Sequence, residues 1–305
     1  MRTVLLPGLL LAAASLPACT ARTANASPTQ VAERPAPARG SGWSFAILGD
    51  NRDDPDSVFP SIVQQIHAEG DLEFVVHLGD IVRSGGESQL RDFLNTSAPI
   101  RECFFPVIGN HEIRRDKDRR AFKAAFGLRS TSYSFTYRNA HVAVIDNASQ
   151  EFSDGVLKWL RADLEKHRKG VGGVERIFVA MHLPPAGFGI SPHVEGDKAQ
   201  QFDTGSRVLI ELLRAYGVDA IFAGHVHRAQ TVDVPDGPRL VISGAAGAPQ
   251  YLRLRPHYGY HSVPVDGTET RVEFVEVNKD QPVPVEHARS HHQATCPNID
   301  DAESG

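Results

Sequence analysis

The sequence predicts an α/β domain, and three observations support this fold class. Short apolar runs alternate with amphipathic segments, which is the pattern of strands and helices around a parallel sheet. Several of the apolar runs end in Gly-Asp or in histidine, and ligands of such sheets bind at the carboxyl ends of the strands. The chain has 305 residues, of which 41% are hydrophobic, which is enough for one large domain with a sizeable core.

The expected elements follow one another in a regular order. Apolar runs that end in a polar residue predict strands of a parallel sheet at 45–48, 72–80, 103–112, 175–185 and 218–229. Amphipathic segments predict helices at 58–67, 88–94, 154–167 and 202–216. Two later apolar runs predict further strands at 239–247 and 271–277.

The middle of the chain has a different pattern. Aromatic residues alternate with polar ones over 133–137, and Arg138-Asn139 then turns the chain into a second apolar run. This predicts a hairpin over 132–146. Asp154 is the candidate N-cap of the helix that follows.

The first 18 residues are predicted to be an export signal. They contain Arg2 and an apolar stretch that is too short for a comfortable membrane span. The letters LPAC at 16–19 resemble the bacterial lipobox, which favours a lipidated Cys19; the alternative is a plain secretory signal cleaved near Ala18. Residues 19–42 would then be a flexible tether. We therefore expect an exported domain, 43–278, anchored to a membrane of the bacterial cell envelope through Cys19, in the periplasm or at the cell surface.

Charge and cysteine content limit the partners. The formal net charge is -5, which argues against nucleic acid as a partner. If Cys19 is lipidated, Cys103 and Cys296 remain in an oxidising compartment, where they either form one disulfide or stay as two free thiols. The polar tail 279–305 is expected to be disordered.

The predicted strand ends carry the side chains of a metal site. They are Asp50, Asp80, Asn110 with His111, His182, and His225 with His227. Carboxylates, imidazoles and an amide oxygen are suitable ligands for two divalent or trivalent metal ions, with Fe, Mn and Zn as candidates. A carboxylate that bridges two cations is the centre of a two-metal hydrolytic site. His77, three residues before Asp80, is expected to be a buried core or supporting histidine and not a ligand.

The succession GD, GD, GNHE, H and GHVH resembles the calcineurin-like metallophosphoesterases over about residues 45–277. The resemblance implies a four-layer α/β fold, in which two mixed β-sheets form a sandwich flanked by helices. The hairpin and the late strands fit the second sheet of such a fold. The activity implied is metal-dependent hydrolysis of a phosphate ester.

The resemblance also implies a role for each site residue. Asp80 would bridge the two metal ions. One metal site would be completed by Asn110, His182 and His225, and the other by Asp50 and His227. His111 would donate a proton to the leaving oxygen, and Glu112 would orient His111.

One position departs from the commonest pattern of that family. The pattern is Asp-x-His, whose histidine is a further ligand of the first metal, whereas this chain has Asp50-Asn51-Arg52. A guanidinium has no lone pair to give, so Arg52 is not a ligand. Purple acid phosphatases also lack this histidine, but they use a tyrosine after the second Gly-Asp, where this chain has GDIVRSG with Arg83.

Three interpretations of Arg52 stay open. Water or a nearby carboxylate (Asp53 or Asp54) takes the vacant position; or Arg52 binds a phosphate oxygen of the substrate, which is the interpretation we prefer; or the first metal site is weak and the protein is a non-catalytic relative. The predicted function is hydrolysis of a phosphate mono- or diester carried by a small molecule, a lipid or a protein. The alternative is an envelope lipoprotein that binds metal or phosphate without turnover.

Overall fold

The structure is a computed structural model, and it describes residues 42–54, 57–115, 117–190, 194, 197–250, 256–278, 280 and 296–301. All of them belong to one unit that spans residues 39–305. The predicted signal, Cys19 and nearly all of the tether lie outside the described residues. Within the described ranges, no helix combines the length and the apolar character needed to cross a membrane.

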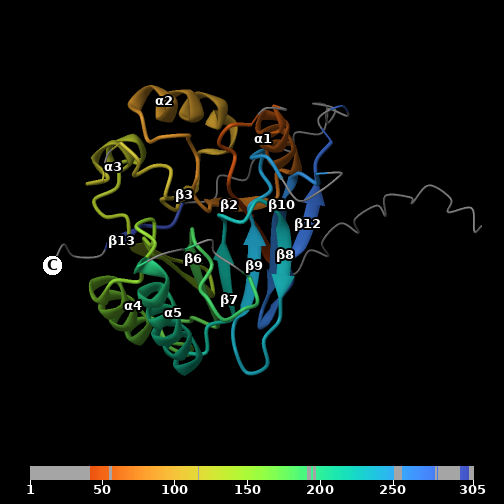
Figure 1. The fold of residues 1–305 in the computed structure, drawn as a ribbon. Coiled ribbons are helices and arrows are strands. Elements are labelled where there is room, and N and C mark those ends of the chain that lie inside the picture. Colours follow the sequence, from red (N-terminus) through yellow and green to blue (C-terminus); the bar gives the residue numbers. More distant parts are fainter. Residues whose placement is uncertain are drawn as a thin grey trace, which may run out of the picture. The chain divides into compact units, whose positions relative to one another are not determined.

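Two mixed β-sheets form the centre of the domain (Figure 1). The first contains β1 (Trp43–Leu48), β2 (Leu72–His77), β3 (Phe104–Pro106), β10 (Gly259–Asp266), β11 (Glu269–Thr270) and β12 (Glu273–Glu276). The second contains β4 (Tyr133–Tyr137), β5 (Ala140–Val144), β6 (Arg176–Met181), β7 (Ala220–Ala223), β8 (Ala229–Val232), β9 (Arg239–Ser243) and β13 (Asp300–Asp301). The strand orders are β11-β10-β1-β2-β3, with β12 also on β10, and β13-β4-β5-β6-β7-β9-β8. The strands that carry the predicted site are parallel within each sheet: β1, β2 and β3 in one, β6 and β7 in the other.

The helices lie in two groups outside the sheets. They are α1 (Val58–Glu69), α2 (Glu87–Thr96), α3 (Arg120–Phe126), α4 (Asp154–Lys166) and α5 (Asp197–Ala215), with a short 3-10 turn at Ala98–Ile100. Figure 1 shows α1, α2 and α3 together on one side, and α4 and α5 together on another.

Alternate residues of the second sheet enter two different cores. Phe178 and Phe222 pack with Phe45 of the first sheet, whereas Val179 and Ile221 pack in the core that contains the apolar faces of α4 and α5. Because successive side chains of a strand point to opposite faces, this sheet is covered on both sides. The predicted α/β sandwich of two mixed sheets flanked by helices is therefore confirmed.

Two parts of the fold differ from the expected elements. β10 was not predicted, since Gly259 and Pro264 usually interrupt strands. On the edge of β10 away from β1, residues 259–262 pair with β12 and residues 265–266 pair with β11. Pro264 lies between these two sets, where neither strand needs a backbone N–H from β10, and so it is tolerated. The helix α4 is capped by Ser153 and not by Asp154, because the Ser153 hydroxyl accepts from the Val156 N–H at 3.3 Å.

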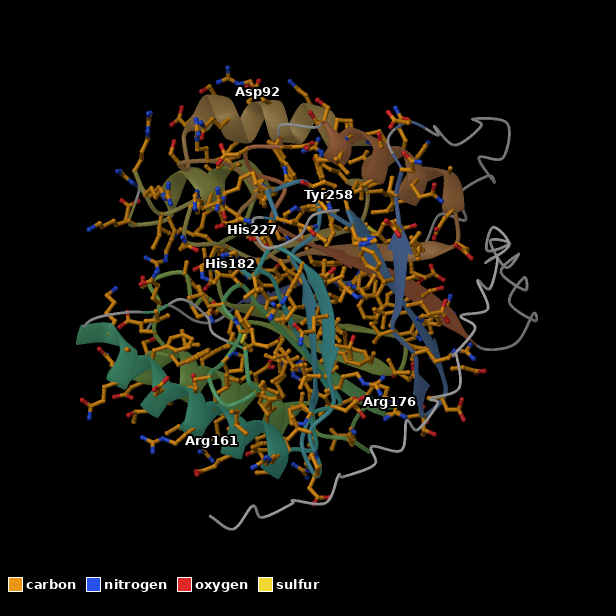
Figure 2. All side chains as sticks on the ribbon, turned by 45° about the vertical axis from the view of Figure 1, so that its right-hand side comes forward. Asp92, Arg161, Arg176, His182, His227 and Tyr258 are labelled. Atoms are coloured by element: carbon orange, nitrogen blue, oxygen red, sulfur yellow. A yellow bond between two sulfur atoms is a disulfide. The ribbon has the colours of Figure 1, made fainter. Side chains whose placement is uncertain are left out.

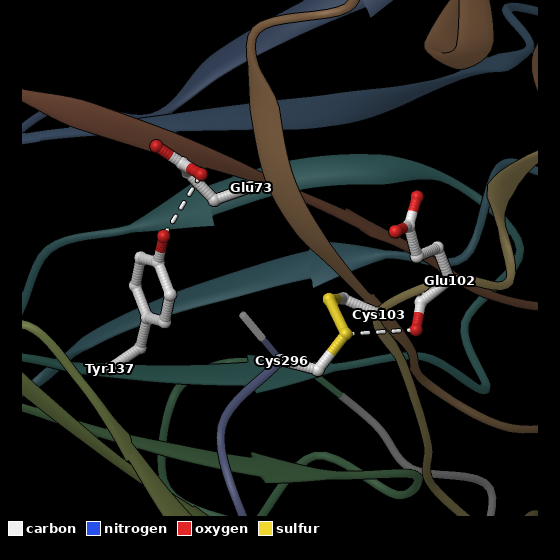
Figure 3. Close-up of a disulfide and its surroundings, with 5 residues drawn as sticks. All are labelled: Glu73, Glu102, Cys103, Tyr137 and Cys296. Atoms are coloured by element: carbon white, nitrogen blue, oxygen red, sulfur yellow. Dashed lines mark hydrogen bonds between the residues drawn. A yellow bond between two sulfur atoms is a disulfide. The ribbon is translucent and has the colours of Figure 1, made fainter. Parts of the chain in front are cut away.

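The expectation of a disordered tail is wrong for residues 296–301. Cys296 forms a disulfide with Cys103, one residue before β3 (Figure 3), which excludes the alternative of two free thiols. Asp300 and Asp301 then add β13 to the edge of the second sheet beside β4. The disulfide, the packing of Ile299 against the core and the ion pair of Asp300 with Lys166 at 3.2 Å all hold this segment in place. The rest of the tail, apart from residue 280, lies outside the described residues.

Candidate metal centre

All of the predicted strand ends meet at one edge of the two sheets. Asp50 follows β1, Asp80 follows β2, Asn110 and His111 follow β3, His182 follows β6, and His225 and His227 follow β7. Figure 2 labels His182 and His227, which lie near each other at this edge. Burial is deepest at Asp50, Asp80 and His182, whose exposure is 1% or less.

The backbone is strained where three of these residues leave their strands. Asp50, Asp80 and His225 have φ angles of 61°, 51° and 67°, in the left-handed region that residues other than glycine seldom adopt. Such strain, about 1–3 kcal/mol per residue, is typical of functional sites. Two glycines leave room for the turns. A Cβ at Gly224 would lie 2.6 Å from Asp50 Oδ2, and one at Gly109 would lie 2.3 Å from the Asp80 nitrogen.

Four electron-pair donors converge in what we call the four-ligand group, formed by Asp80, Asn110, His182 and His225. His182 Nε2 lies 3.2 Å from Asp80 Oδ1, 3.0 Å from Asn110 Oδ1 and 3.2 Å from His225 Nδ1. His225 Nδ1 lies 3.1 Å from Asn110 Oδ1. Ligand atoms around one metal ion at bond lengths of about 2.0–2.2 Å have similar spacings. The residues therefore fit a single metal ion.

The tautomer of His182 makes this fit chemically specific. Its Nδ1 lies 2.8 Å from the Leu78 carbonyl oxygen, which only accepts, so Nδ1 carries the hydrogen. In neutral His182 the Nε2 lone pair then points at carboxylate and amide oxygens that also hold lone pairs. Only a proton or a metal ion between these atoms removes the repulsion.

Without a metal ion, a proton satisfies the group. Burial lowers the pKa of His182, but the Asp80 and Asp50 carboxylates outweigh burial and raise it to about 9. His182 likewise holds the pKa of Asp80 well below its usual range, against the effect of burial. A metal ion must therefore displace this proton from Nε2 in order to bind.

Asp50 and His227 lie beside the four-ligand group. Asp50 Oδ2 accepts from the His225 N–H at 2.8 Å, whereas Asp50 Oδ1 is buried without a hydrogen-bond partner. Burial raises the pKa of Asp50 to about 8, against the attraction of His182. His227 Nδ1 donates to the Pro249 carbonyl oxygen at 2.9 Å, so its Nε2 presents a lone pair, 3.6 Å from Asp50 Oδ1. Asp50, Asp80 and His227 together form a second set of atoms close enough to hold a metal ion.

The guanidinium of Arg52 lies among three side chains of the site. Its Nε donates to Asp80 Oδ2 at 3.0 Å, its Nη2 to His227 Nε2 at 3.3 Å, and its Nη1 to Asp53 Oδ2 at 2.8 Å. The guanidinium thus faces two of the side chains expected to hold the first metal, because they offer it a negative charge and a lone pair. The binding of a phosphate oxygen by Arg52 stays a prediction. Asp54, expected as a possible neighbour of Arg52 or the metal, instead accepts from the first N–H groups of α1.

Glu112 has a different partner from the one expected. Its carboxylate accepts from the N–H groups of Gly109, Asp80 and Val82 at 2.7–3.0 Å, and so joins the ends of β2 and β3. Burial raises the pKa of Glu112 to about 7. The expectation that Glu112 orients His111 is corrected, since it is the Arg83 carbonyl oxygen that bonds to His111 Nδ1, at 2.8 Å.

His111 stands at the side of the centre. Its Nε2 lies 3.7 Å from Asp80 Oδ2 and accepts from Arg114 Nη2 at 2.8 Å. Burial, opposed by Asp80, lowers the pKa of His111 to about 4. The imidazole is therefore neutral near pH 7 in this state and offers a lone pair, not a proton, at Nε2.

Sequence reasoning missed two residues that shape the site. Asn147 holds the end of β6, because its Oδ1 accepts from the His182 and Leu183 N–H groups at 3.2 and 3.1 Å. Arg114 is the partner of His111 described above. Asn147 follows the apolar run that became β5, so its position after a strand was a signal available in the sequence.

Comparisons with known proteins agree with this geometry. Residues 44–229 match the calcineurin-like phosphoesterase family. No curated protein sequence matches the chain. Among solved structures, the chain is similar to GAP50, described as the anchor in the inner membrane complex of Plasmodium, with a TM-score of 0.60 and 16% identity over 80% of this chain and 87% of that one.

Two further structures share the fold. A dimetal phosphatase from Danio rerio aligns with a TM-score of 0.53 and 15% identity, over 77% of this chain and 98% of that one. PhoD aligns with a TM-score of 0.50 and 14% identity, over 79% of this chain and 70% of that one. At these identities the structures show a common fold, and the family match covers more than half of the chain. The protein belongs to the calcineurin-like phosphoesterase family.

Proposed function

We propose that the protein hydrolyses a phosphate mono- or diester at a metal ion held by the four-ligand group. One observation carries the proposal: Asp80, Asn110, His182 and His225 aim four donor atoms at one point, with separations of 3.0–3.2 Å. Such a buried set, with the His182 tautomer fixed by Leu78, suits Fe, Mn or Zn better than it suits an all-oxygen cation such as Ca²⁺.

The chain's own residues supply the rest of the chemistry. A bound metal ion lowers the pKa of water and draws charge from a phosphoryl oxygen. Arg52 adds a fixed positive charge beside Asp80, which favours an anionic phosphoryl group. His111 and Arg114 form the remaining side of the site, and an arriving phosphoryl anion would raise the pKa of His111, so that it could protonate a leaving oxygen.

A second candidate function is binding of metal or phosphate without turnover. It is favoured by Arg52, which faces Asp80 and His227 where the dinuclear site expected from the family resemblance would need metal ligands. The likeness to GAP50, which is described as an anchor, is consistent with this candidate.

The cellular setting is part of the proposal. An export signal at 1–18 and a lipidated Cys19 would place the domain in a bacterial envelope, where phosphorylated small molecules, lipids or proteins are the candidate substrates. Metabolic labelling with a fatty acid tests the anchor. Wild type should take up the label and Cys19→Ala should not, and equal labelling of both would refute lipidation at Cys19.

Hydrolysis of p-nitrophenyl phosphate and bis(p-nitrophenyl) phosphate, with and without added Mn²⁺, tests the activity. The wild type should turn over one of them, lose this activity to a chelator and regain it with Mn²⁺. His182→Ala should abolish turnover, whereas the exposed His257→Ala, a matched histidine substitution far along the chain, should leave it unchanged. Equal turnover by His182→Ala would refute the proposed centre. Bound Mn²⁺ without turnover of any phosphoester would favour the binding function.

A further inference from the structure

The position of Arg52 relative to the metal-binding atoms is the basis of this inference. Its guanidinium donates to Asp80 Oδ2 at 3.0 Å and to His227 Nε2 at 3.3 Å. Asp80 and His227 are two of the three residues whose atoms lie close enough to hold a metal ion in the group that they form with Asp50. A metal ion at that position would need the same lone pairs that the guanidinium uses.

The guanidinium is fixed in this position from several directions. Its third nitrogen, Nη1, donates to Asp53 Oδ2 at 2.8 Å, and the other oxygen of Asp53 pairs with Arg83 at 2.7 Å. The backbone N–H of Arg52 donates to the Asp80 carbonyl oxygen at 3.1 Å. Only 15% of the side chain is exposed. Each of the three guanidinium nitrogens therefore makes a hydrogen bond, and the side chain would have to break all three in order to leave this position.

The positive charge of Arg52, like its position, disfavours a metal ion between Asp50, Asp80 and His227. A guanidinium stays protonated at any accessible pH and has no lone pair, so it repels a neighbouring cation and is not able to act as a ligand. Asp80 carries a negative charge that a first metal ion would neutralise, and Arg52 already supplies a positive charge there. Asp80 contributes its other oxygen, Oδ1, to the four-ligand group. Arg52 therefore does not occupy the Asp80 atom that this group would use to bind a metal ion.

We propose that Arg52 takes the place of the first metal ion, so that the protein binds one metal ion, in the four-ligand group, and uses the guanidinium as the second positive charge of its site. The proposal rests on the proposed function for the location of that metal. It differs from the dinuclear site expected from the family resemblance. Asp50 and His227 then serve as supports of a charged side chain, and not as metal ligands.

The same contacts predict how to restore a second metal ion. Asp50 Oδ1 is buried without a partner, and His227 Nε2 is held as an acceptor by the Pro249 carbonyl. If Arg52 is replaced by histidine, the guanidinium is removed and an imidazole lone pair is added near these atoms. Arg52→His should therefore bind a second metal ion where the wild type binds one.

The experiment is a count of Mn²⁺ in full-length protein that has been stripped of metal, loaded with Mn²⁺ and freed of excess. Elemental analysis gives the number per chain, and electron paramagnetic resonance distinguishes an isolated ion from an exchange-coupled pair. We expect one isolated Mn²⁺ in the wild type and a coupled pair in Arg52→His. Arg271→His is the matched control, since it makes the same exchange at a side chain that is 69% exposed and pairs with Glu273, and it should keep one isolated ion.

Each outcome decides between the claims. A coupled pair in the wild type would overturn the role of Arg52 and leave the proposed function standing. One isolated ion without turnover of any phosphoester would support the role of Arg52 and count against the proposed hydrolysis. No bound Mn²⁺ in the wild type would overturn both. Should Arg52→His fail to fold, as judged by circular dichroism, the wild-type count alone still decides.

Discussion

Replacement of His77 by leucine should stabilise the protein, and more so in acid. His77 is fully buried, and both ring nitrogens lack hydrogen-bond partners. Its ring lies among Phe93, Phe104 and Phe59, with centroid distances of 5.5, 6.0 and 6.2 Å. A buried polar atom without a partner costs about 1–3 kcal/mol, and leucine, similar in size, has none.

The pKa of His77 determines how its effect on the free energy of unfolding depends on pH. Burial, with a smaller effect from His182, lowers the pKa of His77 from 6.5 to about 3. Between these values the unfolded chain holds a proton that the folded chain lacks, so the contribution of His77 to stability falls as the pH falls. The slope is about 1.4 kcal/mol per pH unit, and the loss from about pH 8 to about pH 4.5 is therefore about 2.7 kcal/mol.

Urea unfolding of the metal-free wild type and His77→Leu at both pH values measures this difference. The advantage of His77→Leu should be about 2.7 kcal/mol larger at the lower pH, whatever its packing cost, because packing is common to both conditions. The exposed His257→Leu is the control for loss of a surface histidine, and its effect should stay within about 0.5 kcal/mol. An equal advantage at both pH values would show that His77 is hydrated or charged in the folded protein.

Three further predictions concern the site and the tail. Asp80→Asn removes the charge that the metal ion meets, and should weaken Mn²⁺ binding in isothermal titration by more than about 100-fold; near wild-type affinity would contradict the ligand assignment. His111→Ala should keep the Mn²⁺ content and slow turnover by about 10²- to 10⁴-fold, most for esters with poor leaving groups; loss of Mn²⁺ would mean that His111 is a ligand. Cys296→Ser should lower the free energy of unfolding by about 2–5 kcal/mol, since its disulfide closes a loop of 193 residues; unchanged denaturant unfolding would show that the disulfide is not formed in the protein.

The sequence patterns predicted the order of the strands that carry the site and the convergence of the candidate ligands at one edge of the sheets. Apolar runs that end in Asp or His correspond to β1, β2, β3, β6 and β7, because parallel strands place their carboxyl ends at one edge. An apolar run and the polar residue that ends it are neighbours in the sequence, so this pattern can be recognised in a single sequence. His77 was expected to be buried, and the structure agrees.

Other features depend on contacts between distant residues, which no local pattern encodes. The orientation of Arg52 is set by Asp80 and by His227, 175 residues further along the chain. The bonds of Glu112 go to backbone N–H groups, which every residue other than proline offers, so the sequence did not distinguish them from a bond to His111. The order of residues 296–301 depends in part on a disulfide with Cys103, for which the sequence allowed a free-thiol alternative.

The most direct test of the metal centre is diffraction from crystals of the Mn²⁺-loaded protein at a wavelength near the Mn absorption edge. An anomalous peak should lie between Asp80 Oδ1, Asn110 Oδ1, His182 Nε2 and His225 Nδ1, at about 2.0–2.3 Å from each. Absence of a peak among these four atoms, in protein that elemental analysis shows to contain Mn²⁺, would contradict the account.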